Sequence, residues 1–348
     1  MSPLILSIST MSLVLGTTMT LTASHWLLVW AGLEINTMAI IPFMIHQHHP
    51  RATEATTKYF LTQASASALL LFASTTNAWS TGQWDITQMT NQVSITLLSI
   101  ALALKIGLAP LHFWLPEVLQ GLNLTTGLIL STWQKIAPFA ILLQLYHLLN
   151  PTLMLLLGLL SILIGGWGGL NQTQLRKVMA YSSIAHIGWM VIILYYAPNL
   201  TLLNLIVYMI MTSSLFLLFN ANNATKINSI AISYTKSPLL TAATMLALLS
   251  LGGLPPLTGF MPKWLILQEM TKQNLFIPAT IMALATLLSL FFYLRLCYLI
   301  TLTLSPNPTT SMSSWRTKPY QPNMMTTLMT SMSLMLLPLT PMIMTLTM

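Results

Sequence analysis

Residues 105–112 read Lys-Ile-Gly-Leu-Ala-Pro-Leu-His and lie near the end of an apolar run that begins at about Val93. A lysine at the centre of a membrane helix costs roughly 2.5–3.5 kcal/mol on insertion scales. Further along, Pro110 lacks a backbone donor and interrupts the helix. A buried charge therefore lies beside freed carbonyls and a histidine, His112. Membrane proteins keep such a combination where it lines a polar path or pairs the charge.

The composition of the whole chain is that of a membrane protein. Of its 348 residues, 55% are hydrophobic and 5% are charged, whereas a soluble domain carries roughly 25% charged residues. The apolar runs are continuous and about 20 residues long, which favours helices over the alternating strands of a β-barrel. We therefore expect an all-α polytopic membrane protein with a single transmembrane domain that covers residues 1–348.

Apolar runs of spanning length predict about eleven transmembrane helices. Two of them, at 92–118 and 238–272, are over-long and contain Pro or Gly-Pro interruptions, so each is interpreted as one broken crossing. The other nine spans are 3–21, 25–45, 57–78, 124–146, 151–170, 176–196, 200–220, 276–299 and 323–346.

The positions of the basic residues support this count. With the N-terminus on the positive-rich side, most Lys and Arg residues fall on or near that side. Only Lys272 falls opposite, and Lys105, Lys135 and Lys263 lie within the membrane. The residues on the positive-rich side are Arg51, Lys58, Arg176, Lys177, Lys226, Lys236, Arg295, Arg316 and Lys318.

The broken crossings share a short sequence. Gly-Leu-Ala-Pro-Leu at 107–111 recurs as Gly-Leu-Pro-Pro-Leu at 253–257, and an aromatic residue follows each, Phe113 and Phe260. In the predicted topology the two copies cross in opposite directions, which is typical of an inverted-repeat transporter. We expect repeat halves at about 3–146 and 151–299 and a C-terminal helix at about 323–346. The helix-breaking residues are Pro110, Pro255 and Pro256.

Four ionisable residues lie deep in the predicted helices: Glu34, Lys105, Lys135 and Lys263. Snorkelling to the membrane surface explains Lys105 and Lys135 poorly, because each is about ten residues from either end of its span. Desolvation favours the neutral form of a buried lysine, and an adjacent carboxylate favours the ammonium form. A nearby charge that moves could therefore make each lysine in a row take up and release a proton. The structural alternative is that Glu34 pairs with one lysine and that the other lysines snorkel to the membrane surface.

Histidines add two candidates and no metal site. His112 and His186 lie nearest to membrane depth, and each is either a proton relay or a hydrogen-bonded core residue, since histidine titrates near neutral pH. His46, His48 and His49 lack the Cys or carboxylate support of a metal site. The single cysteine, Cys297, excludes a disulfide framework and a cysteine-ligated cluster.

No nucleotide motif, haem pair or catalytic triad is visible, so we expect any redox chemistry in another subunit. Scattered basic residues disfavour nucleic acid as a partner.

Residues 105–117, Lys-Ile-Gly-Leu-Ala-Pro-Leu-His-Phe-Trp-Leu-Pro-Glu, and 252–264, Gly-Gly-Leu-Pro-Pro-Leu-Thr-Gly-Phe-Met-Pro-Lys-Trp, carry a family resemblance. Over its whole length the chain resembles the antiporter-like membrane subunits of respiratory complex I, in particular the mitochondrially encoded members of animals. The resemblance implies a core subunit of the membrane arm, in the mitochondrial inner membrane with its N-terminus on the matrix side. Such a subunit carries protons, coupled to NADH oxidation by ubiquinone elsewhere in a multisubunit translocase.

The same resemblance implies cofactors and partners. NAD, FMN, iron–sulfur clusters and ubiquinone would be bound in the wider complex and none of them by this chain. The expected partners are other membrane-arm subunits, including the antiporter-like chain 4 and the small chain 4L, accessory subunits, and phospholipid such as cardiolipin.

Roles for single residues also follow from the resemblance. Glu34 would be the glutamate that pairs with the lysine of the first broken helix, Lys105. Lys135 would be the connecting lysine on the next helix, and Lys263 the ionisable residue of the second broken helix. A hydrated polar row at mid-membrane would include His112 and His186. Two alternatives remain open: a stand-alone cation/proton antiporter or solute carrier, which the single deep carboxylate disfavours, and a scaffold that conducts no protons.

Overall fold

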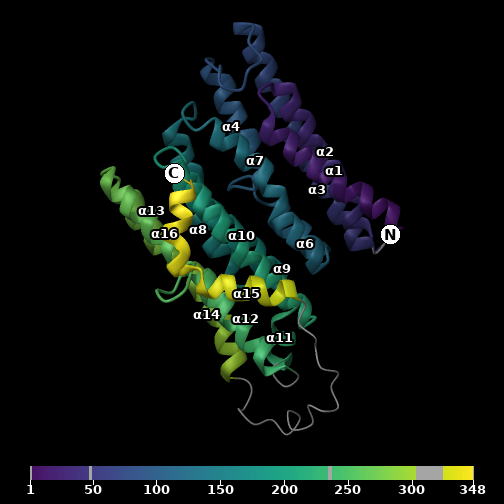
Figure 1. Ribbon diagram of the computed structural model, residues 1–348, viewed down its shortest axis with the longest axis vertical. Coiled ribbons are helices and arrows are strands. Elements are labelled where there is room, and N and C mark those ends of the chain that lie inside the picture. The colour runs from purple at the N-terminus through teal and green to yellow at the C-terminus, as the bar shows by residue number, and fades with distance from the viewer. Residues whose placement is uncertain (1, 47–48, 234–236, 303–323, 348) are drawn as a thin grey trace. The chain divides into compact units, whose positions relative to one another are not determined.

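The structure is a computed structural model that describes residues 2–46, 49–233, 237–302 and 324–347. Within these ranges the chain is largely helical, and bridged extended backbone is limited to two isolated β-bridges. The residues form two compact units, Met1–Leu160 and Ser161–Met348 (Figure 1). Residues named above that lie outside the described ranges are His48, Lys236, Arg316 and Lys318.

The first unit contains seven helices and the beginning of an eighth. In it α2 contacts α1 and α3, and α3 also contacts α4 and α5, so α3 borders both sides of the first break. The helices are α1 (Pro3–Thr22), α2 (Trp26–Ile45), α3 (Pro50–Thr81), α4 (Gln92–Ile106), α5 (Trp114–Gly121), α6 (Leu124–Ser131), α7 (Trp133–Gln144) and α8 (Pro151–Gly169).

The second unit is organised around one buried helix, α9 (Leu175–Ile193), in which every residue from Ser182 to Ile193 is buried. It contacts α10, which in turn contacts α12 and α15. The remaining elements are α10 (Pro198–Ala221), α11 (Ile227–Ser233), α12 (Pro238–Gly252), α13 (Phe260–Lys272), α14 (Phe276–Leu302), α15 (Met324–Met335), the 3₁₀ turn η2 (Leu337–Leu339) and α16 (Thr340–Thr347).

Proline and glycine set many of the helix boundaries. Proline is the first residue of α1, α3, α8, α10 and α12, where its missing N–H breaks no helical hydrogen bond and its fixed φ suits the first turn. Glycine in the left-handed conformation ends α3, α4 and α12, because this conformation carries no Cβ penalty for glycine. These glycines are Gly82, Gly107 and Gly253.

The all-α, multi-pass membrane architecture predicted from the sequence is confirmed, but the count of eleven spans is not. Six described helical segments, one of them α6 and α7 taken together, are long and apolar enough to cross a membrane, and a bent pair at the C-terminus makes up to seven. The helices α4 and α12 have 15 residues each, which is about 22 Å of helix against a hydrocarbon core of about 30 Å. Neither spans alone, so each needs the segment beyond its break.

The expected continuous helix at 323–346 is wrong in one respect. The chain bends by 70° between α15 and the segment that follows it. Pro338, which lies in the intervening turn η2, lacks the N–H that a continuing helix would need. The C-terminal segment is therefore two short helices.

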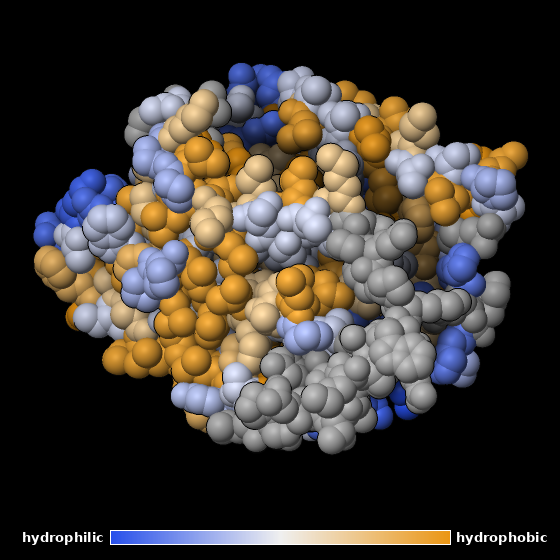
Figure 2. All heavy atoms as spheres, turned by 60° about the horizontal axis from the view of Figure 1, so that its bottom comes forward, coloured by the Kyte–Doolittle hydropathy of each residue, from blue (hydrophilic) through white to orange (hydrophobic). Residues whose placement is uncertain are grey.

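Large apolar side chains are exposed on the surface of both units. On α1 the exposed fraction is 65% for Leu4, 60% for Ile8 and 67% for Met11, and on α14 it is 75% for Ile277 and 66% for Leu284. Figure 2 shows broad apolar areas on one face of the molecule. Exposed apolar surface of this extent marks contact with lipid or with other protein.

Candidate functional site

The first helix break begins at a glycine. Gly107 follows α4 with φ 86° and ψ 44°, and its N–H donates to the carbonyl of Ala103. A seven-residue loop that starts at this glycine leads to α5, and its Ala109–Pro110 peptide is cis. The indole Nε1 of Trp114 donates to the freed carbonyl of Leu104 at 3.1 Å. The break predicted at Pro110 is therefore present, and the residue that ends α4 is Gly107.

The second break has the same backbone plan. Gly253 follows α12 with φ 81° and ψ 43°, and its N–H donates to the carbonyls of Leu249 and Ser250. Again seven residues, counted from the glycine, lead to the next helix, which begins at Phe260. The prolines Pro255 and Pro256 lie within this loop, as predicted.

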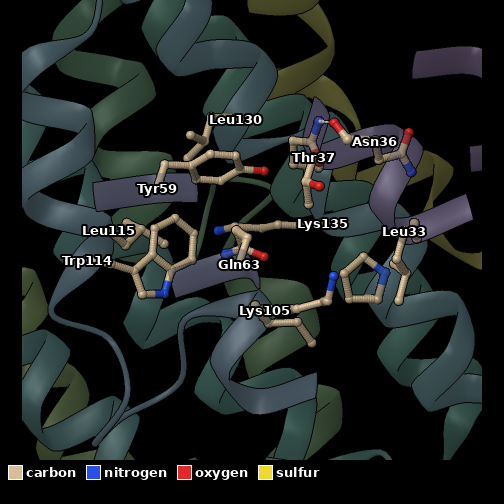
Figure 3. Close-up of a pocket in the computed structure, with 14 residues that line it drawn as sticks. Leu33, Asn36, Thr37, Tyr59, Gln63, Lys105, Trp114, Leu115, Leu130 and Lys135 are labelled. Atoms are coloured by element: carbon tan, nitrogen blue, oxygen red, sulfur yellow. Dashed lines mark hydrogen bonds between the residues drawn. The ribbon is translucent and has the colours of Figure 1, made fainter. Parts of the chain in front are cut away.

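Lys105 and Lys135 line one small cavity in the first unit (Figure 3). Both side chains are buried, with 6% of each residue exposed. The cavity measures about 20 Å³, which is enough for one water, since about 10–15 Å³ is the minimum. Lys105 comes from α4 and Lys135 from α7, so the cavity joins the broken helix to its neighbour.

Besides the amide of Gln134, two more deeply buried side-chain amides that the sequence analysis missed line this cavity, Asn36 of α2 and Gln63 of α3. Each is 3% exposed. Within the described part of the chain, neither polar atom of the Asn36 amide has a hydrogen-bond partner, and the same is true of Gln63 Nε2 and Lys105 Nζ. Polar groups around a cavity of this size are the setting in which proteins hold ordered water. An isolated amide in an apolar helix is the sequence signal that could have revealed them.

Glu34 lies on α2, half-buried and beside a groove of about 460 Å³ between α1 and α2. Its carboxylate accepts hydrogen bonds from Thr37 Oγ1 at 2.9 Å and from Ser67 Oγ at 3.1 Å. Among the described residues no cationic nitrogen lies within 4.0 Å of it, so Glu34 and Lys105 form no direct ion pair.

Lys263 lies on α13 of the second unit, and its side chain reaches back across the second break to the end of α12. Its Nζ donates to the carbonyl of Gly252 at 2.8 Å and to that of Leu251 at 3.4 Å, which are the last two residues of α12. A cation at a helix C-terminus is stabilised by the helix dipole as well as by these bonds. Lys263 is thus a charged cap of α12, a role that the sequence analysis did not foresee.

The two histidines lie in different units. His112 is in the loop of the first break, 3% exposed, with its ring 4.4 Å from that of Phe113. His186 is in α9, 6% exposed, with its ring 5.7 Å from that of Tyr208. The structure therefore places Lys105 and Lys135 at one cavity of the first unit, Glu34 beside a separate groove of that unit, and His186 and Lys263 in the second unit. No group of His, Cys, Asp or Glu side chains suited to a metal ion occurs in the described ranges.

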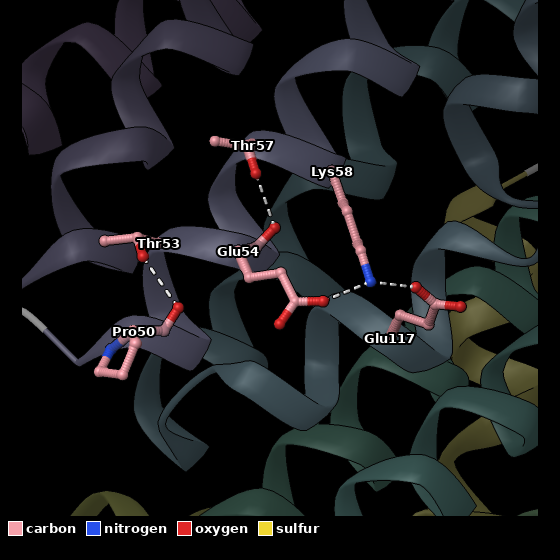
Figure 4. A network of polar contacts seen from close by, with 6 residues as sticks. All are labelled: Pro50, Thr53, Glu54, Thr57, Lys58 and Glu117. Atoms are coloured by element: carbon pink, nitrogen blue, oxygen red, sulfur yellow. Dashed lines mark hydrogen bonds and ion pairs between the residues drawn. The ribbon is translucent and has the colours of Figure 1, made fainter.

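A surface ion-pair network ties α5 to α3 (Figure 4). Lys58 Nζ lies 2.7 Å from a carboxylate oxygen of Glu54 and 2.7 Å from one of Glu117. All three side chains are exposed to solvent, so the network holds the segment beyond the first break only weakly.

Two family models match the chain. Residues 23–289 match the transmembrane domain of NADH:quinone oxidoreductases and Mrp antiporters, and residues 290–344 match the C-terminus of NADH dehydrogenase subunit 2. The NADH-ubiquinone oxidoreductase chain 2 of Squalus acanthias is 71% identical over 347 residues, which cover 100% of both chains. The chain belongs to the NADH-ubiquinone oxidoreductase chain 2 family. The chain 2 of Scyliorhinus canicula is 68% identical and covers 99% of each chain.

Solved structures share the fold of this chain. A chain of respiratory complex I from Thermus thermophilus aligns with a TM-score of 0.80 and 27% identity, covering 95% of this chain and 78% of that one. A chain of the Mrp complex from Dietzia sp. aligns with a TM-score of 0.76 and 19% identity, over 84% of this chain and 60% of that chain, and shows the shared fold. The chain is thus an antiporter-like membrane subunit of complex I.

Proposed function

We propose that this chain carries protons across the mitochondrial inner membrane, coupled to NADH oxidation by ubiquinone in other subunits of complex I. The observation that supports the proposal best is the cavity shared by Lys105 and Lys135. Two buried lysines from different helices line it beside a helix break, together with amide atoms that have no hydrogen-bond partner among the described residues, and it has room for a water.

Proton transfer through this cavity needs a charge that changes the protonation equilibrium of a lysine. Glu34 lies in the same unit as Lys105 and forms no ion pair with it among the described residues. Its carboxylate also borders a groove that opens to the surface of the first unit, so a charge arriving outside α1 and α2 would act on it. A change at Glu34 then shifts the proton affinity of Lys105, and Lys135 receives or supplies the proton across the cavity.

In this proposal, other chains of complex I hold the cofactors and contact this chain in the membrane. NAD, FMN, iron–sulfur clusters and ubiquinone are bound by other subunits, and the chain 4 and chain 4L subunits, accessory subunits and cardiolipin are its partners. The N-terminus lies on the matrix side, since that orientation places most basic residues there. In the second unit, Lys263 and His186 are the residues that carry protons.

The test is the Lys105→Ala substitution in assembled complex I. Protons translocated per NADH oxidised are measured in proteoliposomes, and we expect this ratio to fall. The matched control is Lys58→Ala, which removes an exposed lysine from the same unit and leaves the cavity intact. An unchanged ratio for Lys105→Ala in a fully assembled complex would remove Lys105 from the path and favour the scaffold role.

A further inference from the structure

A buried hydrogen bond joins the second helix break to the C-terminal helix. Thr258 Oγ1, in the loop between α12 and α13, donates to the backbone carbonyl of Ser333 in α15 at 2.5 Å. Both residues are 1% exposed, and they lie 75 positions apart in the chain. The bond therefore connects two segments that only the folded structure brings together.

The end of α15 explains why the carbonyl of Ser333 is available. The last four carbonyls of a helix have no intrahelical donor, and Ser333 is among the last four residues of α15. The chain bends by 70° just beyond it, so Leu337, whose N–H would bond this carbonyl in a continuing helix, already belongs to the turn η2. The hydroxyl of Thr258 supplies the missing donor, and the bond satisfies a buried polar group on each side.

The loop that contains Thr258 also sets the position of Lys263. At its start, a Cβ added to Gly253 would lie 2.9 Å from Lys263 Nζ. At its end, a Cβ added to Gly259 would overlap the carbonyl oxygen of Ser250. The loop is thus packed against Lys263 at its start and against the end of α12 at its end, so a shift of Thr258 moves the start of α13, which carries Lys263.

We propose that Thr258 is a positioning residue for Lys263. The C-terminal helix α15 holds the loop through the Thr258–Ser333 bond and so keeps Lys263 against the carbonyls of Leu251 and Gly252. The C-terminal segment is then a brace for the second break, in addition to any contact it makes with lipid or other subunits. The functional consequence rests on the proposed role of Lys263 in proton transfer, whereas the positional consequence does not.

The test uses three variants of assembled complex I. Thr258→Val keeps the side-chain shape and removes the donor, Thr258→Ser keeps the donor, and Ser333→Ala removes a side-chain hydroxyl but keeps the accepting carbonyl. An experimental map of each variant gives the separation of Lys263 Nζ from the Gly252 oxygen, and proteoliposomes give protons per NADH.

With Thr258→Val we expect this separation to lengthen beyond about 3.5 Å, the limit of a hydrogen bond. In Thr258→Val we also expect fewer protons per NADH, with a loss nearly as large as that of Lys263→Met. Thr258→Ser and Ser333→Ala should match the wild type in both measurements. An unchanged separation with Thr258→Val overturns the proposal. A lengthened separation with an unchanged proton ratio supports the brace and instead overturns the role of Lys263 in proton transfer.

If Thr258→Val prevents assembly, Thr258→Cys replaces it, because a thiol is a weak donor of similar size. The proposal then requires a longer Lys263–Gly252 separation in Thr258→Cys than in Thr258→Ser. Equal separations in these two variants overturn it.

Discussion

The first break places its lysine before the glycine, and the second places its lysine after it. Both loops begin at a glycine with nearly equal dihedral angles and run for seven residues. In the first, the neutral indole of Trp114 bonds the freed carbonyl, and Lys105 Nζ faces the cavity. In the second, Lys263 itself bonds the freed carbonyls. The same backbone plan therefore leaves Lys105 Nζ without a hydrogen-bond partner among the described residues and holds Lys263 Nζ against the end of a helix.

When the sequence of the first break is aligned on that of the second at Gly107 and Gly253, other positions of the two breaks also correspond. Glu117 occupies the position of Lys263, and it bonds the exposed Lys58 rather than a helix end. Phe113 occupies the position of Gly259, and 71% of Phe113 is exposed. Side chains at these two positions of the first break are thus exposed, whereas the matching residues of the second break are closely packed.

The largest expected effect is at Gly259. Gly259→Ala forces a Cβ into the carbonyl oxygen of Ser250, and overpacking of a buried contact costs typically 1–3 kcal/mol and occasionally more, so we expect about 3 kcal/mol. Phe113→Ala, at the matching position, is expected to stay within about 0.5 kcal/mol, as exposed substitutions do. The measurement is the amount and thermal stability of assembled complex. Equal loss at both positions would show that the two loops are packed alike.

The lysines themselves give the next effect. Lys263→Met leaves the carbonyls of Leu251 and Gly252 without their charged donor, and we expect a loss of about 2 kcal/mol. Lys105→Met replaces a buried ammonium by an apolar side chain of similar length, which is often neutral or stabilising. Thermal unfolding of the purified complex with each variant checks the difference. Equal destabilisation by both would contradict the contrast drawn between the two breaks.

The smallest effect is expected at the position that matches Lys263. Glu117→Gln weakens one exposed contact of Lys58, and exposed ion pairs contribute little. Assembly, thermal stability and protons per NADH should all match the wild type. A marked loss of pumping with Glu117→Gln would show that the surface network acts on the first break.

The sequence predicted both broken helices and their charged residues, because Gly and Pro act through local backbone geometry. It did not predict which group satisfies each freed carbonyl, since Trp114 and Lys263 reach their acceptors through tertiary packing. Asn36 and Gln63 were missed because facing positions on α2 and α3 are not visible in one dimension. The bend at Pro338 was missed because apolar length alone was taken to predict one helix.

The measurement that tests the account most directly is protons per NADH for the Lys105→Met, Lys263→Met double variant beside the two single variants. If both lysines serve one proton path, removing either lysine blocks that path completely. The double variant then has the same loss in protons per NADH as a single variant. A deficit equal to the sum of the two would assign the lysines to separate paths. A wild-type ratio in the assembled double variant would contradict the proposal that these lysines carry protons.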